Sequence, residues 1–224
     1  MTGAGTAERR AVWLLALGQM LGYACFFYLF AALILYWRAD LHWGDGLLAS
    51  GLTLAIVVAA VMAPLSGRAV DRGHAAALLA GGAVIGAASL VLLAVANGPA
   101  VYLLAWAGLG LAQAASLYEP CFSLLIHRFG AEARAAITRV TLIGGFASTF
   151  AFPAGAALAE GFGWRVTVWV AAAVAAGLIL PLNLIGARIL ARGVPPVPAT
   201  EGRPKVALWA MFRQWPFLRL TLMF

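Results

Sequence analysis

The chain has 224 residues, of which 64% are apolar and only 10% are charged. Soluble domains are typically about 45–50% apolar and about 25% charged, so this composition excludes a soluble enzyme, a disordered tail and a disulfide scaffold, and indicates an integral membrane protein. The net charge of +7 is typical of basic loops on the cytoplasmic side of a membrane, and nucleic-acid binding is not needed to explain it.

Six apolar stretches follow one another along the chain, each long enough for a membrane-spanning helix, which needs about 20 residues. They cover residues 11–37, 46–66, 75–96, 101–126, 140–159 and 166–190. A seventh stretch starts near Leu208 and still continues at Phe224. We therefore predict an all-α integral membrane fold. A cytoplasmic amino terminus (1–10) precedes a six-helix bundle (11–190), and a truncated seventh helix starts in 206–224.

A proline-rich segment over 191–205 lies between the sixth and seventh stretches. It contains Pro195, Pro196, Pro198 and Pro204. Proline ends helices and keeps the preceding residue extended. We predict a cytoplasmic linker here, separating the six-helix unit from the seventh stretch.

Basic residues are distributed unequally between alternate loops. The loops after the first, third and fifth stretches carry only Arg38 and Arg165. The amino end and the loops after the second, fourth and sixth stretches carry Arg9, Arg10, Arg68, Arg72, Arg128, Arg134, Arg139, Arg188, Arg192, Arg203 and Lys205. Membrane proteins keep such an excess on the cytoplasmic side. The amino terminus and the linker are therefore predicted to face the cytoplasm.

A weak internal repeat relates the two halves of the six stretches. At one constant offset, residues 14–16 (Leu-Leu-Ala) recur at 103–105, Pro64 recurs as Pro153, and Asp71 recurs as Glu160. Three predicted helices separate the copies, so the second copy is inverted in the membrane. Inverted three-plus-three repeats are a feature of secondary transporters.

The turn between the second and third stretches has the spacing Gly67-x-x-x-Asp71-Arg72-Gly73. Gly67 lets two helix backbones approach closely. Asp71 places a carboxylate at the membrane surface, where it can pair with an arginine or face the positive end of a helix. Gly73 permits a tight turn. An ordinary charged turn is the alternative interpretation of the same residues.

This spacing resembles the signature G-x-x-x-D-R-x-G-R-R of the major facilitator superfamily. Gly67, Asp71 and Arg72 match in register, whereas Gly73 comes one residue early and His74 and Ala75 stand where the family has a basic pair. The predicted helix over 140–159 is similar to the family's glycine- and proline-rich fifth helix, through Gly144, Gly145, Ser148, Pro153 and Gly155. Residues 117–120 (L-Y-E-P) are similar to a segment common in bacterial members.

The resemblance covers nearly the whole chain and implies a twelve-helix transporter made of two six-helix bundles with a cavity between them. It implies that this chain is an amino-terminal half, whose partners are a small-molecule substrate, the lipid bilayer and the missing carboxy-terminal bundle. A multi-pass protein of the bacterial cytoplasmic membrane is expected. Transport is expected to proceed by alternating access, driven by an ion gradient.

The predicted helix over 101–126 carries one polar face. At about 100° per residue, Gln113, Ser116, Glu119 and Ser123 fall within an arc of about 120°, and in the fold that the resemblance implies this face looks into the cavity. Glu119 is the acidic residue well inside a predicted span, and charge within a bilayer is costly and usually functional. The adjoining Pro120 removes a backbone hydrogen bond and can loosen the helix there.

Two functions are open for Glu119: it carries a proton, or it binds a cationic group of the substrate. The structural alternative is a pair with Arg134 or Arg139, or a carboxylate that reaches the headgroups. In the predicted helix over 11–37, Gln19 and Tyr23 either line the cavity or make hydrogen bonds between helices. The small polar face of 140–159 (Thr141, Gly145, Ser148) fits close packing as well as substrate contact.

Several chemistries lack their motifs. The sequence has no G-x-S-x-G, no H-E-x-x-H and no Walker A lysine loop, so a serine protease, a metalloprotease and ATP-driven transport have no support. Nothing in it predicts a cofactor, a metal site or a nucleic-acid partner. Two other classes stay open beside a transporter: a membrane scaffold or assembly partner without transport, and an intramembrane enzyme.

Overall fold

The computed structural model describes residues 3–192, and every regular element in that range is helical. The predicted start of a seventh helix and all but the first two residues of the predicted linker lie outside the described residues. The first helix begins at Gly3 rather than at residue 11, so the end predicted as a separate terminus is largely part of that helix.

The helices follow the apolar stretches in order. They are α1 (Gly3–Tyr23), the π-helical turn η1 (Ala24–Tyr28), α2 (Leu29–Leu41), α3 (Asp45–Asp71), α4 (Ala75–Ala94), α5 (Pro99–Ser116), α6 (Tyr118–Phe129), the 3₁₀ turn η2 (Gly130–Glu132), α7 (Ala133–Gly144), α8 (Ala147–Phe162), α9 (Trp164–Val174), the π-helical turn η3 (Ala175–Ile179) and α10 (Leu180–Ala191).

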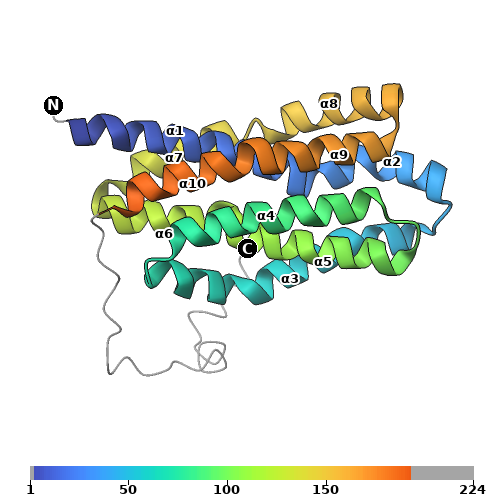
Figure 1. Ribbon diagram of the computed structural model, residues 1–224, viewed down its shortest axis with the longest axis horizontal. Helices are drawn as coiled ribbons and strands as arrows, with labels where there is room; N and C mark the ends of the chain where they lie inside the picture. The colour runs from blue at the N-terminus through green and yellow to red at the C-terminus, as the bar shows by residue number, and fades with distance from the viewer. Residues whose placement is uncertain (1–2, 193–224) are drawn as a thin grey trace, which may run out of the picture.

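Five continuous stretches among the described residues are long and apolar enough to cross a membrane: Gly5–Leu41, Asp45–Asp71, Ala75–Ala94, Pro99–Phe162 and Trp164–Ala191. The fourth is 64 residues long and turns back at η2, so it makes two passes (Figure 1). Residues 3–192 therefore pass along the bundle six times, as an all-α membrane fold requires.

Two of the passes are broken near their middle. Leu117 has φ −90° and ψ −156°, which ends α5 and lets α6 start in a new direction. Pro120 explains part of this break, because its missing N–H leaves the carbonyl of Ser116 without its helical partner. The fifth pass is interrupted at Gly145 and Phe146, between α7 and α8.

The packing of the passes follows the pattern expected for an inverted repeat. The second pass (α3) packs on the fourth (α5), and the fifth pass (α7) packs in the same way on the first (α1). The third pass (α4) packs on the fourth (α5), and the sixth pass (α10) packs in the same way on the first (α1). The third and sixth passes, α4 and α9–α10, pack against each other. These are the contacts that an exchange of the first three passes with the last three would preserve (Figure 1).

Small residues bring the helices close together at several of these contacts. A Cβ at Gly110 would lie 2.5 Å from the Ala55 carbonyl oxygen, and one at Gly51 would lie 2.6 Å from Trp106 Cδ1. Only glycine allows such an approach. The close approach predicted at Gly67 is not formed within the described residues, where no neighbour lies within 4 Å of its Cβ position.

The two ends of the bundle differ in composition. We call one the basic end: it comprises the amino terminus of α1, the α3–α4 turn, the α6–α7 connection and the end of α10, which lie together in Figure 1. The arginines predicted to face the cytoplasm that lie within residues 3–192 are at or near this end. The opposite end, the aromatic end, carries a buried cluster of Phe30, Trp37, Tyr102, Trp106 and Trp164.

Candidate functional site

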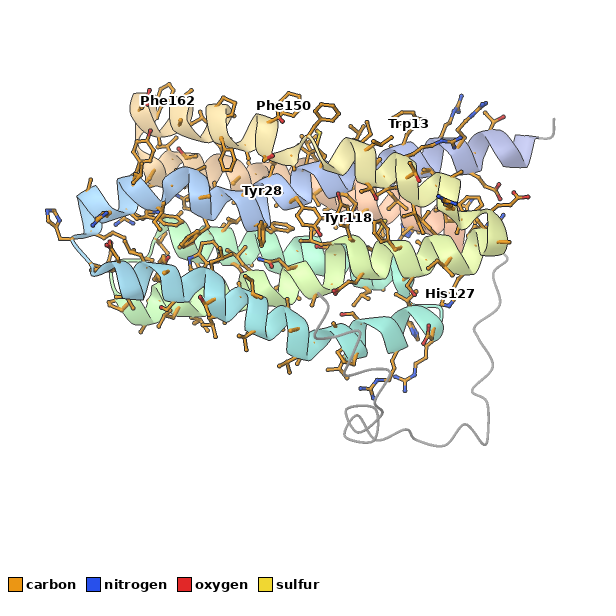
Figure 2. The ribbon with its side chains drawn as sticks, turned by 180° about the vertical axis from the view of Figure 1, so that it is seen from behind. Trp13, Tyr28, Tyr118, His127, Phe150 and Phe162 are labelled. Atoms are coloured by element: carbon orange, nitrogen blue, oxygen red, sulfur yellow. The ribbon has the colours of Figure 1, made fainter. Side chains whose placement is uncertain are left out.

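Three irregular segments meet near the middle of the bundle: η1, the break at Leu117 and the break between α7 and α8. The Tyr23 and Tyr118 rings have centroids 4.4 Å apart, which joins α1 to α6. Gly144, at the end of α7, packs directly against the Tyr118 hydroxyl. Figure 2 shows Tyr28 and Tyr118 near the middle of the bundle's length. Discontinuous helices of this kind form the substrate sites of many transporters.

Two buried glutamines hold the first and fourth passes together at these irregularities. Gln19 Nε2 donates to the Ser116 carbonyl oxygen at 2.8 Å, the acceptor that Pro120 leaves without a helical donor. Gln113 Nε2 donates to the Phe26 carbonyl oxygen at 2.8 Å, inside η1, where the π-helical turn disturbs the regular hydrogen bonding. Each glutamine thus satisfies a backbone acceptor of the other pass.

The single polar face predicted over 101–126 is not formed. Gln113 and Ser116 are buried inside the bundle, whereas Glu119 is exposed and Ser123 half-buried. The prediction assumed an unbroken helix, and the break at Leu117 separates the first pair from the second. Of the two roles considered for Gln19, the structure shows the hydrogen bond between helices.

Glu119 lies in the first turn of α6 and faces outward from the six passes. Within residues 3–192, arginine pairs with an acid at Arg38–Asp45 and Arg128–Glu8, and His127 contacts Asp71. A pair between Glu119 and Arg134 or Arg139 is therefore absent from the part of the chain that the structure describes. Tyr23, which is half-buried on α1, meets the ring of Tyr118, the residue that precedes Glu119.

Aromatic rings lie close to one another around Tyr118, the residue that precedes Glu119 in the chain. Tyr118 stacks on Phe122 with centroids 4.8 Å apart, and Tyr28 meets Phe152 of α8 edge to face at 5.8 Å. Tyr23 and Tyr28 are 6.4 Å apart. We call this surface the mid-bundle face; it comprises Tyr23, Tyr28, Tyr118, Glu119, Phe122 and Phe152.

Tyr23 and Glu119 of this face were predicted from the sequence as candidate site residues, but the other rings were not. The Y-E dipeptide of residues 118–119 was a signal for Tyr118. The rings of Tyr28 and Phe152 come from separate passes, and no local pattern places them together.

Of the residues predicted on the fifth pass, Gly144 and Gly155 pack against neighbouring passes. Gly155 packs on Ala32, with 2.9 Å between its Cβ position and the Ala32 Cβ, and Gly144 accommodates Tyr118. Gly145 lies at the break after α7 and is exposed, as is Pro153 within α8. Ser148 is half-buried.

The turn after α3 forms a separate site at the basic end. Gly73 has φ +83°, so the tight turn predicted there is formed in the left-handed region that favours glycine. Arg72 is exposed. The Asp71 carboxylate lies 3.5 Å from His127 Nε2 at the end of α6, whereas the sequence left open an arginine partner or the positive end of a helix. His127 lies beside this turn in Figure 2.

Among residues 3–192, no three His, Cys, Asp or Glu side chains are grouped as metal ligands. The cysteines Cys25 and Cys121 are buried and free.

The family model described as Major Facilitator Superfamily matches residues 9–224. No curated protein and no solved structure matched the chain.

Proposed function

The chain belongs to the major facilitator superfamily, whose model matches residues 9–224, and on this basis we propose that it is the amino-terminal half of a secondary active transporter. It would move a small molecule by alternating access, together with a second six-helix bundle. The family match favours a transporter over the membrane scaffold and the intramembrane enzyme considered from the sequence.

The observation that supports the site is the position of the mid-bundle face. It lies midway along the passes, where transporters of this general kind bind their substrates between two bundles. It is also where η1 and both helix breaks meet, so small changes at the breaks would alter its shape. We propose that it forms one wall of the substrate cavity.

Glu119 is the group on this wall to which we assign the central role. An exposed carboxylate inside a membrane protein is tolerable when a water-filled cavity or a charged ligand faces it. The aromatic rings beside it favour a substrate with a positive charge on an apolar body, because ring faces attract cations by about 0.5–2 kcal/mol each. We propose that Glu119 binds the cationic group of the substrate, with a proton carrier as the alternative.

The test uses Glu119→Gln in the complete transporter, in reconstituted vesicles. If Glu119 binds a cation, substrate binding, exchange and gradient-driven accumulation are all lost together. If it carries a proton, accumulation is lost and exchange of bound substrate continues. If its role is structural, the melting temperature falls and transport per folded molecule stays near normal, which would remove Glu119 from the site.

Glu160→Gln is the matched control. Glu160 is an exposed acid at the aromatic end of α8 that accepts a hydrogen bond from Tyr36 at 3.3 Å. It is far along the bundle from the mid-bundle face, so its neutralisation is expected to leave binding unchanged.

We further propose that the basic end faces the cytoplasm of a bacterial cell, from the unequal distribution of arginine. Cysteine labelling in intact cells tests this after Cys25 and Cys121 are replaced by alanine. A cysteine at Ala69 is expected to resist an impermeant reagent added outside, and one at Ala39, which is exposed near the end of α2 at the aromatic end, to react. The reverse pattern would contradict the orientation.

A further inference from the structure

A cavity of about 1050 Å³ opens at the basic end, between the first turns of α1 and the η2–α7 segment. It is separate from the mid-bundle face, none of whose residues lines it. We call it the basic cavity. Its polar lining includes Thr6, Glu8, Arg9, Glu132, Arg134 and Arg139.

Positive charge predominates in the basic cavity. Arg128, which is not part of the lining, binds Glu8 through Nε at 3.0 Å and through a second guanidinium nitrogen. That contact compensates the charge of Glu8. Arg9, Arg134 and Arg139 then face the single remaining acid Glu132, and within the described residues none of the three forms an ion pair.

An apolar surface continues from the cavity along both of its walls. On α1, Arg9 is followed at helical spacing by Trp13 and Leu17, which are 47% and 41% exposed. On α7, Arg139 is followed by Leu142, which is 64% exposed. Residues three or four apart lie on the same side of a helix. Each wall therefore changes from arginine to apolar side chains in the direction of the bundle's middle.

We propose that the basic cavity binds the phosphate-bearing headgroup of an anionic phospholipid, whose acyl chains lie along Trp13, Leu17 and Leu142. Arginine recognises phosphate through paired N–H donors, and basic pockets between membrane helices bind anionic headgroups. Trp13 has the character of a residue at headgroup depth. A free phosphate ion would use the arginines alone and leave the apolar walls unexplained.

The test measures lipid retention by the purified protein. Wild type is prepared in detergent, supplied with phosphatidylglycerol and phosphatidylcholine, and examined by mass spectrometry of the intact complex. Wild type is expected to retain phosphatidylglycerol in preference to phosphatidylcholine. R134Q/R139Q is expected to retain it about tenfold less well, since each arginine near an anionic surface contributes about fivefold and part of that attraction is general.

R72Q/R188Q is the matched control. Arg72 and Arg188 are exposed at the same end and do not line the basic cavity. Their replacement removes the same net charge as R134Q/R139Q. This double variant is expected to retain phosphatidylglycerol nearly as wild type does. Equal losses in the two double variants would mean a general surface attraction and would overturn the proposal.

Two further measurements separate the remaining explanations. E132Q removes the opposing acid of the cavity and is expected to increase retention, a gain that misfolding cannot produce. Inorganic phosphate at millimolar concentration is expected not to displace the lipid. Displacement by phosphate, or no preference for phosphatidylglycerol in wild type, would overturn the proposal without bearing on transport.

Discussion

The aromatic end and the mid-bundle face use the same kinds of side chain in opposite ways. At the aromatic end, Trp37 packs edge to face on Tyr102 and Trp106, with centroids 5.8 Å and 6.1 Å away, and all three are buried. On the mid-bundle face, the rings of Tyr28 and Phe152 also meet edge to face, but both are partly or largely exposed. Ring contacts alone therefore do not make a core.

The difference lies in the surrounding helices and charges. The helices α2, α3 and α5 are uninterrupted at the aromatic end, and Gly51 lets α3 lie close to the rings. Arg165 there donates to the carbonyl oxygens of Ala94 and Ala96 at 2.8 Å and 3.1 Å, and Trp164 donates to Asp40 at 2.8 Å. At the mid-bundle face the helices are broken, and Glu119 has no ion-pair partner within residues 3–192. The rings of the aromatic end are therefore buried, whereas those of the mid-bundle face are partly or largely exposed.

The largest expected effect on stability comes from removing a buried ring at the aromatic end. Trp106→Ala should destabilise the protein by about 3–5 kcal/mol, because it leaves a large cavity among rings that cannot collapse into it. Thermal unfolding in detergent measures the loss. Trp169→Ala, at a side chain that is 46% exposed, should change stability by about 0.5 kcal/mol or less. Similar losses for both would mean that the aromatic end is not a packed core.

An intermediate effect is expected at the glutamines that connect the two regions. Gln113→Ala leaves the Phe26 carbonyl oxygen buried without its donor, at a cost of about 1–3 kcal/mol. It should also weaken substrate binding, since Phe26 lies between Tyr23 and Tyr28 of the mid-bundle face. The melting temperature and the substrate affinity are measured together. Thr53→Val is the control, because the Thr53 hydroxyl is exposed and bonds within its own helix; an equal loss there would remove the special role of Gln113.

The sequence predicted the helical class, the membrane location and the number of passes, because long apolar runs and arginine-rich loops are local features. The positions of Gln19 and Gln113 could not be interpreted fully, since each bonds to a backbone atom about half the described chain away. The polar face over 101–126 failed for a related reason. Angular arithmetic assumes a regular helix, and the sequence marks the break at Leu117 only indirectly, through Pro120.

A smaller effect is expected for Asp71→Asn at the basic end. The Asp71 carboxylate contacts His127 at the surface and is far from the mid-bundle face. In the complete transporter this change should slow turnover and leave substrate affinity within about threefold, or under about 0.7 kcal/mol. Transport rates and equilibrium binding check the two parts separately. A tenfold loss of binding would place Asp71 in the substrate site.

The smallest stability effect is expected at Gly67, and α3 offers its own control. Gly67→Ala meets no neighbour within 4 Å and should raise stability slightly, by about 0.5–1 kcal/mol, because alanine favours a helix more than glycine does. Gly51→Ala, on the same helix at the aromatic end, places a Cβ 2.6 Å from Trp106 and should be destabilising. Unfolding temperatures of the two variants compare the ends of one helix directly.

A loss of transport in a stable Gly67→Ala variant would concern contacts of Gly67 outside the described residues. It would show that Gly67 is needed where α3 meets a surface beyond residues 3–192, because within that range its Cβ position is open. The second bundle of the proposed transporter is the candidate for that surface. Normal transport with normal stability would instead leave Gly67 without a packing role in either bundle, and of the residues that match the family signature only Asp71 and Arg72 would then keep a proposed role.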